Sequence, residues 1–161
     1  MNADWFFNVV HRAGHFVLPE GHLLKVPRAL FDSGALGASY ISEQFVSDNA
    51  KILNPLLDIA RGSVKLASSH HVVAITHSIL LVTQFADSTG RTHSATLRLY
   101  VLPGLNSDIV VGLPAIVTSF GPLFIEMIQG ALAQKTEASY INNTLAPDLN
   151  YSHMLLTLTS Y

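Results

Sequence analysis

The chain of 161 residues contains no cysteine, which excludes a disulfide framework and a thiolate metal site and fits a reducing compartment. Charged residues make up only 12% of it, against roughly 25% in an average soluble protein. The 9 Lys and Arg are scattered and the formal net charge is −2, so no nucleic-acid partner is expected. No uncharged stretch with a helical pattern reaches the roughly 18 residues of a membrane span. The first residues do not resemble a signal peptide, so we expect a cytoplasmic protein without membrane contact.

Several catalytic signatures are also missing. There is no Gly-x-Ser-x-Gly elbow, and Ser39 and Ser42 lack a recognisable base. There is no glycine-rich phosphate loop followed by a lysine. Eight histidines are present, but His-Glu-x-x-His does not occur and no ligand cluster can be recognised. We therefore expect no metal and no cofactor.

Apolar residues, in contrast, are abundant, at 49% of the chain. A chain this short cannot hide so much apolar surface in its own core. The composition therefore predicts that part of the surface is buried in a partner.

Apolar runs and turn residues recur about every dozen residues, which indicates an all-β fold with one or two short helices. Ser42 can cap a helix that ends before Pro55. Pro114–Phe120 can form a second, short helix with proline in its first turn, and Leu123–Ile128 fits either a strand or a helix. Strands are expected at Trp5–Val10, His15–Leu18, Leu23–Phe31, Val64–Leu66, Val72–Ile75, Ile79–Phe85, Ala95–Leu102 and Ile109–Val111.

The character of the sequence changes after Gly130, where it becomes polar and weakly patterned. We expect one domain at residues 1–130 and a C-terminal extension at 131–161. The extension is expected to dock on the domain or to form a dimer contact, with residues 154–161 as a possible strand.

A carboxylate stands at the end of an apolar strand, in the triplet Asp32-Ser33-Gly34. A charged group among apolar neighbours costs several kcal/mol unless it is paired, hydrogen-bonded or functional. Gly34 allows close approach of a second backbone, and Ser33 can brace the turn. The alternative interpretation is an ordinary turn aspartate.

Three segments, in the same order along the chain, resemble the retropepsin family, the single-domain aspartic proteases of retroviruses and LTR retrotransposons. Within this family they are most similar to the proteases of gypsy-like retrotransposons. "ALFDSGALGASYIS" is similar to the active-site strand, "VKLASSHHVVAI" lies where the family has its flap hairpin, and "LRLYVLPGLNSDIVVGLPAI" leads to the second signature. The resemblance implies a retropepsin-like closed barrel with a flap hairpin that acts as a homodimer. Two departures are a flap tip without glycine and Leu113-Pro114 after the second signature.

The family's roles carry over to matching positions. Asp32 would pair with Asp32 of a second copy, while Ser33 braces the two turns. Val110, Val111 and Gly112 would pack behind the turn, and Phe31, Ile75 and Ile109 would be core or pocket wall. Contacts to a peptide substrate are expected from Gly34, Ala35, Ala67, Ser68, Ser69, His70 and Val111.

The expected activity is an aspartic endopeptidase that processes a polyprotein, within retroelement particles if the gene belongs to a retrotransposon. Two alternatives stay open. One is a non-enzymatic or domesticated domain that only dimerises or binds peptide. The other is a cellular relative that cleaves ubiquitin-linked or regulatory proteins.

Overall fold

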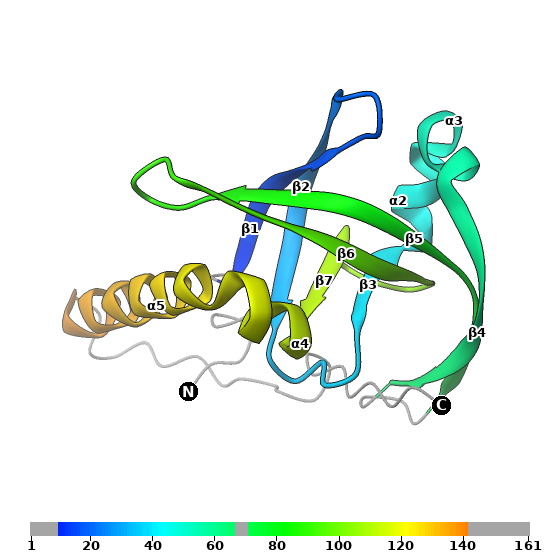
Figure 1. The fold of residues 1–161 in the computed structure, drawn as a ribbon. Coiled ribbons are helices and arrows are strands. Elements are labelled where there is room, and N and C mark those ends of the chain that lie inside the picture. The colour runs from blue at the N-terminus through cyan, green and yellow to red at the C-terminus, as the bar shows by residue number, and fades with distance from the viewer. Residues whose placement is uncertain (1–9, 67–70, 142–161) are drawn as a thin grey trace.

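A computed structural model describes residues 10–66 and 71–141, and the surroundings of side chains as far as residue 134. It is mostly β with a few helices (Figure 1). The strands are β1 (His11–Val17), β2 (Leu23–Asp32), β3 (Ser39–Ser42), β4 (Leu57–Lys65), β5 (Val72–Ala86), β6 (Thr92–Leu102) and β7 (Ile109–Gly112). The helices are α2 (Glu43–Asp48), α3 (Ala50–Leu53), the 3-10 turn η1 (Asn54–Leu56), α4 (Leu113–Ala115), the π-helical turn η2 (Ile116–Phe120) and α5 (Gly121–Ile141).

The strands of the described residues form one mixed sheet in the order β1-β2-β7-β3-β6-β5-β4. β2 pairs with β7, and β3 with β6, in parallel, whereas the other neighbours are antiparallel. β1 also pairs with β5, so the first strand connects two distant parts of the sheet. Gly14 allows this approach, because a Cβ there would lie 2.5 Å from the carbonyl oxygen of Gln84.

The expected strands are largely confirmed, with three differences. The structure places residues 11–14 inside β1, where the sequence indicated a break. β4 begins at Leu57, earlier than expected, and the two runs expected at 72–75 and 79–85 are one strand, β5. β5 stays continuous because its first half pairs with β4 and its second half with β6. The strand expected at residues 5–10 falls outside the described residues except for Val10.

The helix expected after Ser42 is confirmed, and its cap is formed as predicted. The Ser42 hydroxyl accepts a hydrogen bond from the Phe45 N–H at 3.2 Å. The helix divides into α2 and α3 at Asn49, whose side-chain amide donates to the Phe45 carbonyl at 2.9 Å. This local bond competes with the regular helical pattern at the division.

The chain from Leu113 to Ile141 is helical, which resolves the choice left open at Leu123–Ile128 in favour of a helix. Pro122 has no N–H to donate and would clash with the Thr118 carbonyl in a regular α-helix. The wider turn η2 ends at Phe120, two residues before Pro122, and π-helical turns of this kind relieve such a clash. α5 then runs through Gly130, so the domain boundary expected there falls inside one helix.

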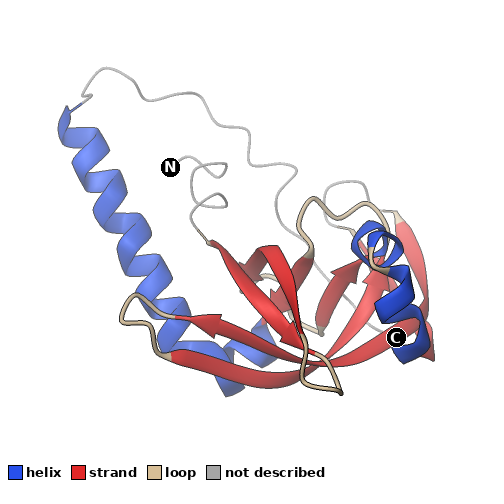
Figure 2. Ribbon diagram, turned by 90° about the horizontal axis from the view of Figure 1, so that it is seen from above, coloured by secondary structure: helices blue, strands red, loops and turns tan. Residues whose placement is uncertain are grey.

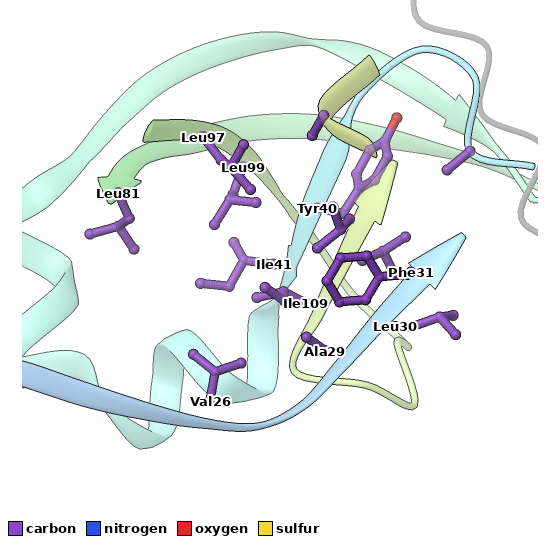
Figure 3. Close-up of a cluster of buried hydrophobic side chains, with 14 of the residues drawn as sticks. Val26, Ala29, Leu30, Phe31, Tyr40, Ile41, Leu81, Leu97, Leu99 and Ile109 are labelled. Atoms are coloured by element: carbon purple, nitrogen blue, oxygen red, sulfur yellow. The ribbon is translucent and has the colours of Figure 1, made fainter. Parts of the chain in front are cut away.

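The core is built from the sheet, from α2 and α3, and from the start of this helix. The rings of Phe31, Phe85 and Phe120 meet edge to face, with centroid distances of 4.9, 5.4 and 6.0 Å. Phe31, Ile75 and Ile109 are buried and belong to the core. Figure 3 shows Phe31 and Ile109 within it. Phe31, one of the three, directly precedes Asp32 in β2.

Candidate active site

Asp32 is the last residue of β2 and lies opposite Gly112 of β7 in the parallel pair. Its side chain is buried, with 5% of the residue exposed. The Gly34 N–H donates to Asp32 Oδ1 at 2.8 Å, and the Ala35 N–H donates to the Asp32 carbonyl at 3.1 Å. The carboxylate is thus held at one orientation by a tight turn, as the Asp-Ser-Gly triplet predicts.

The loop after this turn is fastened to the β7–α4 junction. The Leu113 N–H donates to the Ala35 carbonyl at 2.8 Å. A Cβ on Gly112 would lie 2.0 Å from the Ala38 carbonyl oxygen and 2.9 Å from that of Ala35, so only glycine fits there. The loop and β7 therefore touch backbone to backbone, directly beside Asp32.

Ser39 contributes to the same junction, and the sequence analysis did not assign it this role. Its buried hydroxyl accepts a hydrogen bond from the Gly112 N–H at 3.0 Å. A serine 73 positions away in sequence gives no local signal for such a bond. Only the register of β3 against β7 brings the two groups together.

Replacing Ser39 with alanine is expected to lower the free energy of unfolding by about 1–3 kcal/mol, because the buried Gly112 N–H loses its acceptor. Urea unfolding of Ser39→Ala measures the loss. Ser47→Ala, at an exposed position of α2, is the matched control and should change stability by less than about 0.5 kcal/mol. Equal effects of the two substitutions would contradict the assigned bond.

The other predicted site residues differ in their exposure. Ser33 is exposed, Gly34 is half-buried and the side chain of Ala35 is fully buried. The side chain of Val111 is also fully buried, which fits packing behind the turn. Its contact with a substrate stays a prediction that this burial does not favour.

The β4–β5 hairpin corresponds to the expected flap. Its strands pair from Gly62 with Ile75 to Lys65 with Val72, and the Leu66 N–H donates to the His71 carbonyl at 3.0 Å. The end of this hairpin and the β2–β3 loop lie on the same lower side of the molecule in Figure 1. The expected substrate contacts of the flap, Ala67, Ser68, Ser69 and His70, lie outside the described residues.

Tyr40 is a buried polar residue on β3. Its hydroxyl has no hydrogen-bond partner among the described residues and points away from Ile41 and Ile109 (Figure 3). Burial, with a smaller contribution from Tyr100, raises the pKa of Tyr40 to about 12. The phenol therefore stays neutral where an exposed tyrosine would ionise.

This raised pKa predicts alkaline destabilisation. The unfolded chain releases the Tyr40 proton near pH 10 and the folded chain only near 12, so stability falls as the pH rises through this window. The contribution to the slope is at most about 1.4 kcal/mol per pH unit. Tyr40→Phe should unfold with a shallower pH dependence between pH 10 and 12 in urea titrations. Identical slopes for the two proteins would contradict the assignment.

No group of three or more His, Asp or Glu side chains that could hold a metal ion occurs within residues 10–66 and 71–134. His11 and His15 both lie in β1, four residues apart on a strand.

Comparisons with known proteins add little to this geometry. No protein-family profile matches the chain, and no curated protein sequence matches it. Among solved structures, the chain is similar to the retroviral protease-like domain of Ddi1 from Leishmania major, at 17% sequence identity with a TM-score of 0.42. The similarity covers 67% of this chain and 76% of that one.

Proposed function

We propose that the protein is an aspartic endopeptidase in which Asp32 side chains from two copies of the chain activate a water molecule. The observation that carries this proposal is a buried carboxylate, 5% exposed, oriented by the Gly34 N–H at 2.8 Å on a turn fastened to β7. Structural turn aspartates are usually solvated, whereas a buried and oriented carboxylate is the arrangement that acid–base chemistry uses.

Hydrolysis of an amide by water needs a base and an acid together. One carboxylate takes a proton from water, the oxygen of which attacks the carbonyl carbon, and a protonated carboxyl gives its proton to the carbonyl oxygen. The resulting diol collapses with breakage of the C–N bond while a proton moves to the leaving nitrogen. Two adjacent carboxylates share one proton and so fill both roles.

The sequence contains the Asp-Ser-Gly triplet once, so the second carboxylate has to come from a second copy. A two-fold axis beside Asp32 would bring the two turns together in an isologous dimer. The loop that follows the buried carboxylate carries exposed groups: Ser33 is exposed, and 58% of Leu36 is exposed although it is a large apolar residue. A second copy would cover them.

The substrate we propose is an extended peptide that lies between the β2–β3 loop and the β4–β5 hairpin. More specifically, the proposed substrate is a retroelement polyprotein that is cut in the cytoplasm or inside particles. The proposed fold is a closed barrel, which the ring of pairings through β1, β2, β7, β3, β6 and β5 supports. Neither a metal nor a cofactor takes part in the proposed reaction.

A domain that binds peptide or dimerises without cleavage is the second candidate. The observation that favours it is the flap tip at residues 67–70, which has no glycine to help it bend. Such a domain would bind peptide between the same loop and hairpin and would form the same dimer.

The test is cleavage of a peptide library near pH 5 by the purified chain, with and without a statine-containing peptide. A statine hydroxyl imitates the diol, so it should bind far more tightly than the matching substrate and stop cleavage. Cleavage that resists statine peptides but stops with a serine-protease reagent or a metal chelator would contradict an aspartic mechanism. Tight statine binding without any cleavage would favour the second candidate.

A further inference from the structure

The helix that follows β7 is apolar on two opposite sides. One side faces the core and is buried: Ile116, Phe120, Leu123, Met127 and Ala131. The other side, which we name the outer stripe, consists of Val117, Ile125 and Leu132, with 71%, 58% and 47% of each residue exposed. A helix that is apolar around its circumference is normally covered on all sides.

Charge does not explain the exposure of the outer stripe. Glu126 is the only charged residue from Leu113 to Gln134, and it contacts the turn between β5 and β6 and strand β1. Its carboxylate accepts hydrogen bonds from the backbone and hydroxyl of Ser88 and lies 3.8 Å from the Arg12 guanidinium. These contacts fix the rotation of α5, so the outer stripe must face away from the sheet.

The described residues leave most of this helix uncovered. Within the segment Leu113–Gln134, an 18-residue stretch has a mean hydropathy of 1.4, and 33% of that stretch is buried. By length and composition alone it could cross a membrane, a test that core helices of soluble proteins also pass. Figure 2 shows that α5 extends beyond the strands, so the sheet cannot cover its outer side.

We propose that residues Met154–Leu158 of the same chain cover the C-terminal part of the outer stripe, at Ile125 and Leu132. Four of these five residues are Met or Leu, the densest apolar run after α5. Pro147 lies between α5 and this run and prevents one continuous helix, so the chain can reverse. The proposal is independent of the proposed protease activity.

The length of the intervening chain permits this return. Residues 142–153 are twelve residues, which span up to about 40 Å when extended. α5 has 21 residues and is therefore about 31 Å long. A run of five residues in extended form covers about 16 Å, more than the roughly 10 Å of helix between Ile125 and Leu132.

Because the chain contains no cysteine, two introduced cysteines would be its only thiols, so a thiol cross-link would report their separation alone. The double variant Leu132→Cys with Leu156→Cys joins the outer stripe to the proposed cover, and a short bis-maleimide is the cross-linker. The control is Gln134→Cys with Leu156→Cys, because Gln134 is exposed two positions along but on the opposite side of the helix. Circular dichroism checks that both variants fold.

Each variant is cross-linked as an equal mixture of unlabelled and ¹⁵N-labelled chains in the 161-residue form. We expect the outer-stripe variant to give links within one isotope form, at a yield at least about fivefold above the control, since docking raises the local concentration. Mixed light–heavy links would overturn the proposal in favour of a second copy on the stripe. Equal yields in the two variants, or no links together with sedimentation on phosphatidylcholine–phosphatidylserine vesicles, would overturn it as well.

Discussion

Replacing Asp32 with asparagine is expected to lower kcat for peptide cleavage by at least about a thousandfold while the protein stays folded and dimeric. Asparagine has the same shape, and its side-chain oxygen can still accept the Gly34 N–H bond. It cannot take a proton from water, so both roles of the shared proton are lost. Steady-state kinetics, thermal melting and sedimentation on the same preparation measure the three properties.

The matched control for this substitution is Asp48→Asn. Asp48 is exposed at the end of α2 and accepts a hydrogen bond only from the side chain of Gln44 among the described residues. Its replacement should leave kcat/KM within about twofold and stability within about 0.5 kcal/mol. Retention of cleavage by Asp32→Asn would contradict the proposed chemistry, and equal losses in the two variants would point to a general effect of charge.

Gly112→Ala is expected to lower the free energy of unfolding by about 3 kcal/mol or more and to reduce cleavage more than tenfold. The new Cβ would meet the Ala38 carbonyl oxygen at 2.0 Å, so β7 and the β2–β3 loop must move apart. This movement would disturb both the hydrogen bond from the Gly112 N–H to the Ser39 hydroxyl and the pairing of Gly112 with Asp32. Urea unfolding and kcat measure the two effects.

The matched control is Gly130→Ala, which is expected to stabilise the protein instead of destabilising it. Gly130 lies inside α5, and a Cβ there would meet nothing within 4 Å. Alanine is a better helix former than glycine, so this variant should gain about 0.5–1 kcal/mol without a change in activity. A loss at Gly130 as large as that at Gly112 would contradict the steric explanation.

The parts of the fold that could be predicted are those with strong local signals. β6 alternates buried and exposed residues, Ser42 is an N-cap, and Asp32 ends an apolar strand before two small residues. The β4 segment from Leu57 was missed because this strand pairs only with β5 among the described strands. Only one of its residues, Val64, is buried, and Ile59 is 85% exposed.

The remaining differences arise from tertiary contacts that leave no local pattern. The Ser39–Gly112 bond depends on β3 lying beside β7, and the continuity of β5 depends on two different partners. α5 has apolar residues on two sides, which hides the helical period and left the choice between strand and helix open. The exposure of its outer stripe could be seen only in the structure.

The central claim is that two Asp32 side chains from two chains form one active site. The most direct measurement is the activity of a fixed amount of the wild-type chain mixed with increasing Asp32→Asn chain, after subunit exchange. At a tenfold excess we expect activity to fall to about a tenth, because random pairing places most wild-type subunits with an inactive partner. Activity that stays constant as the variant is added would contradict a shared site.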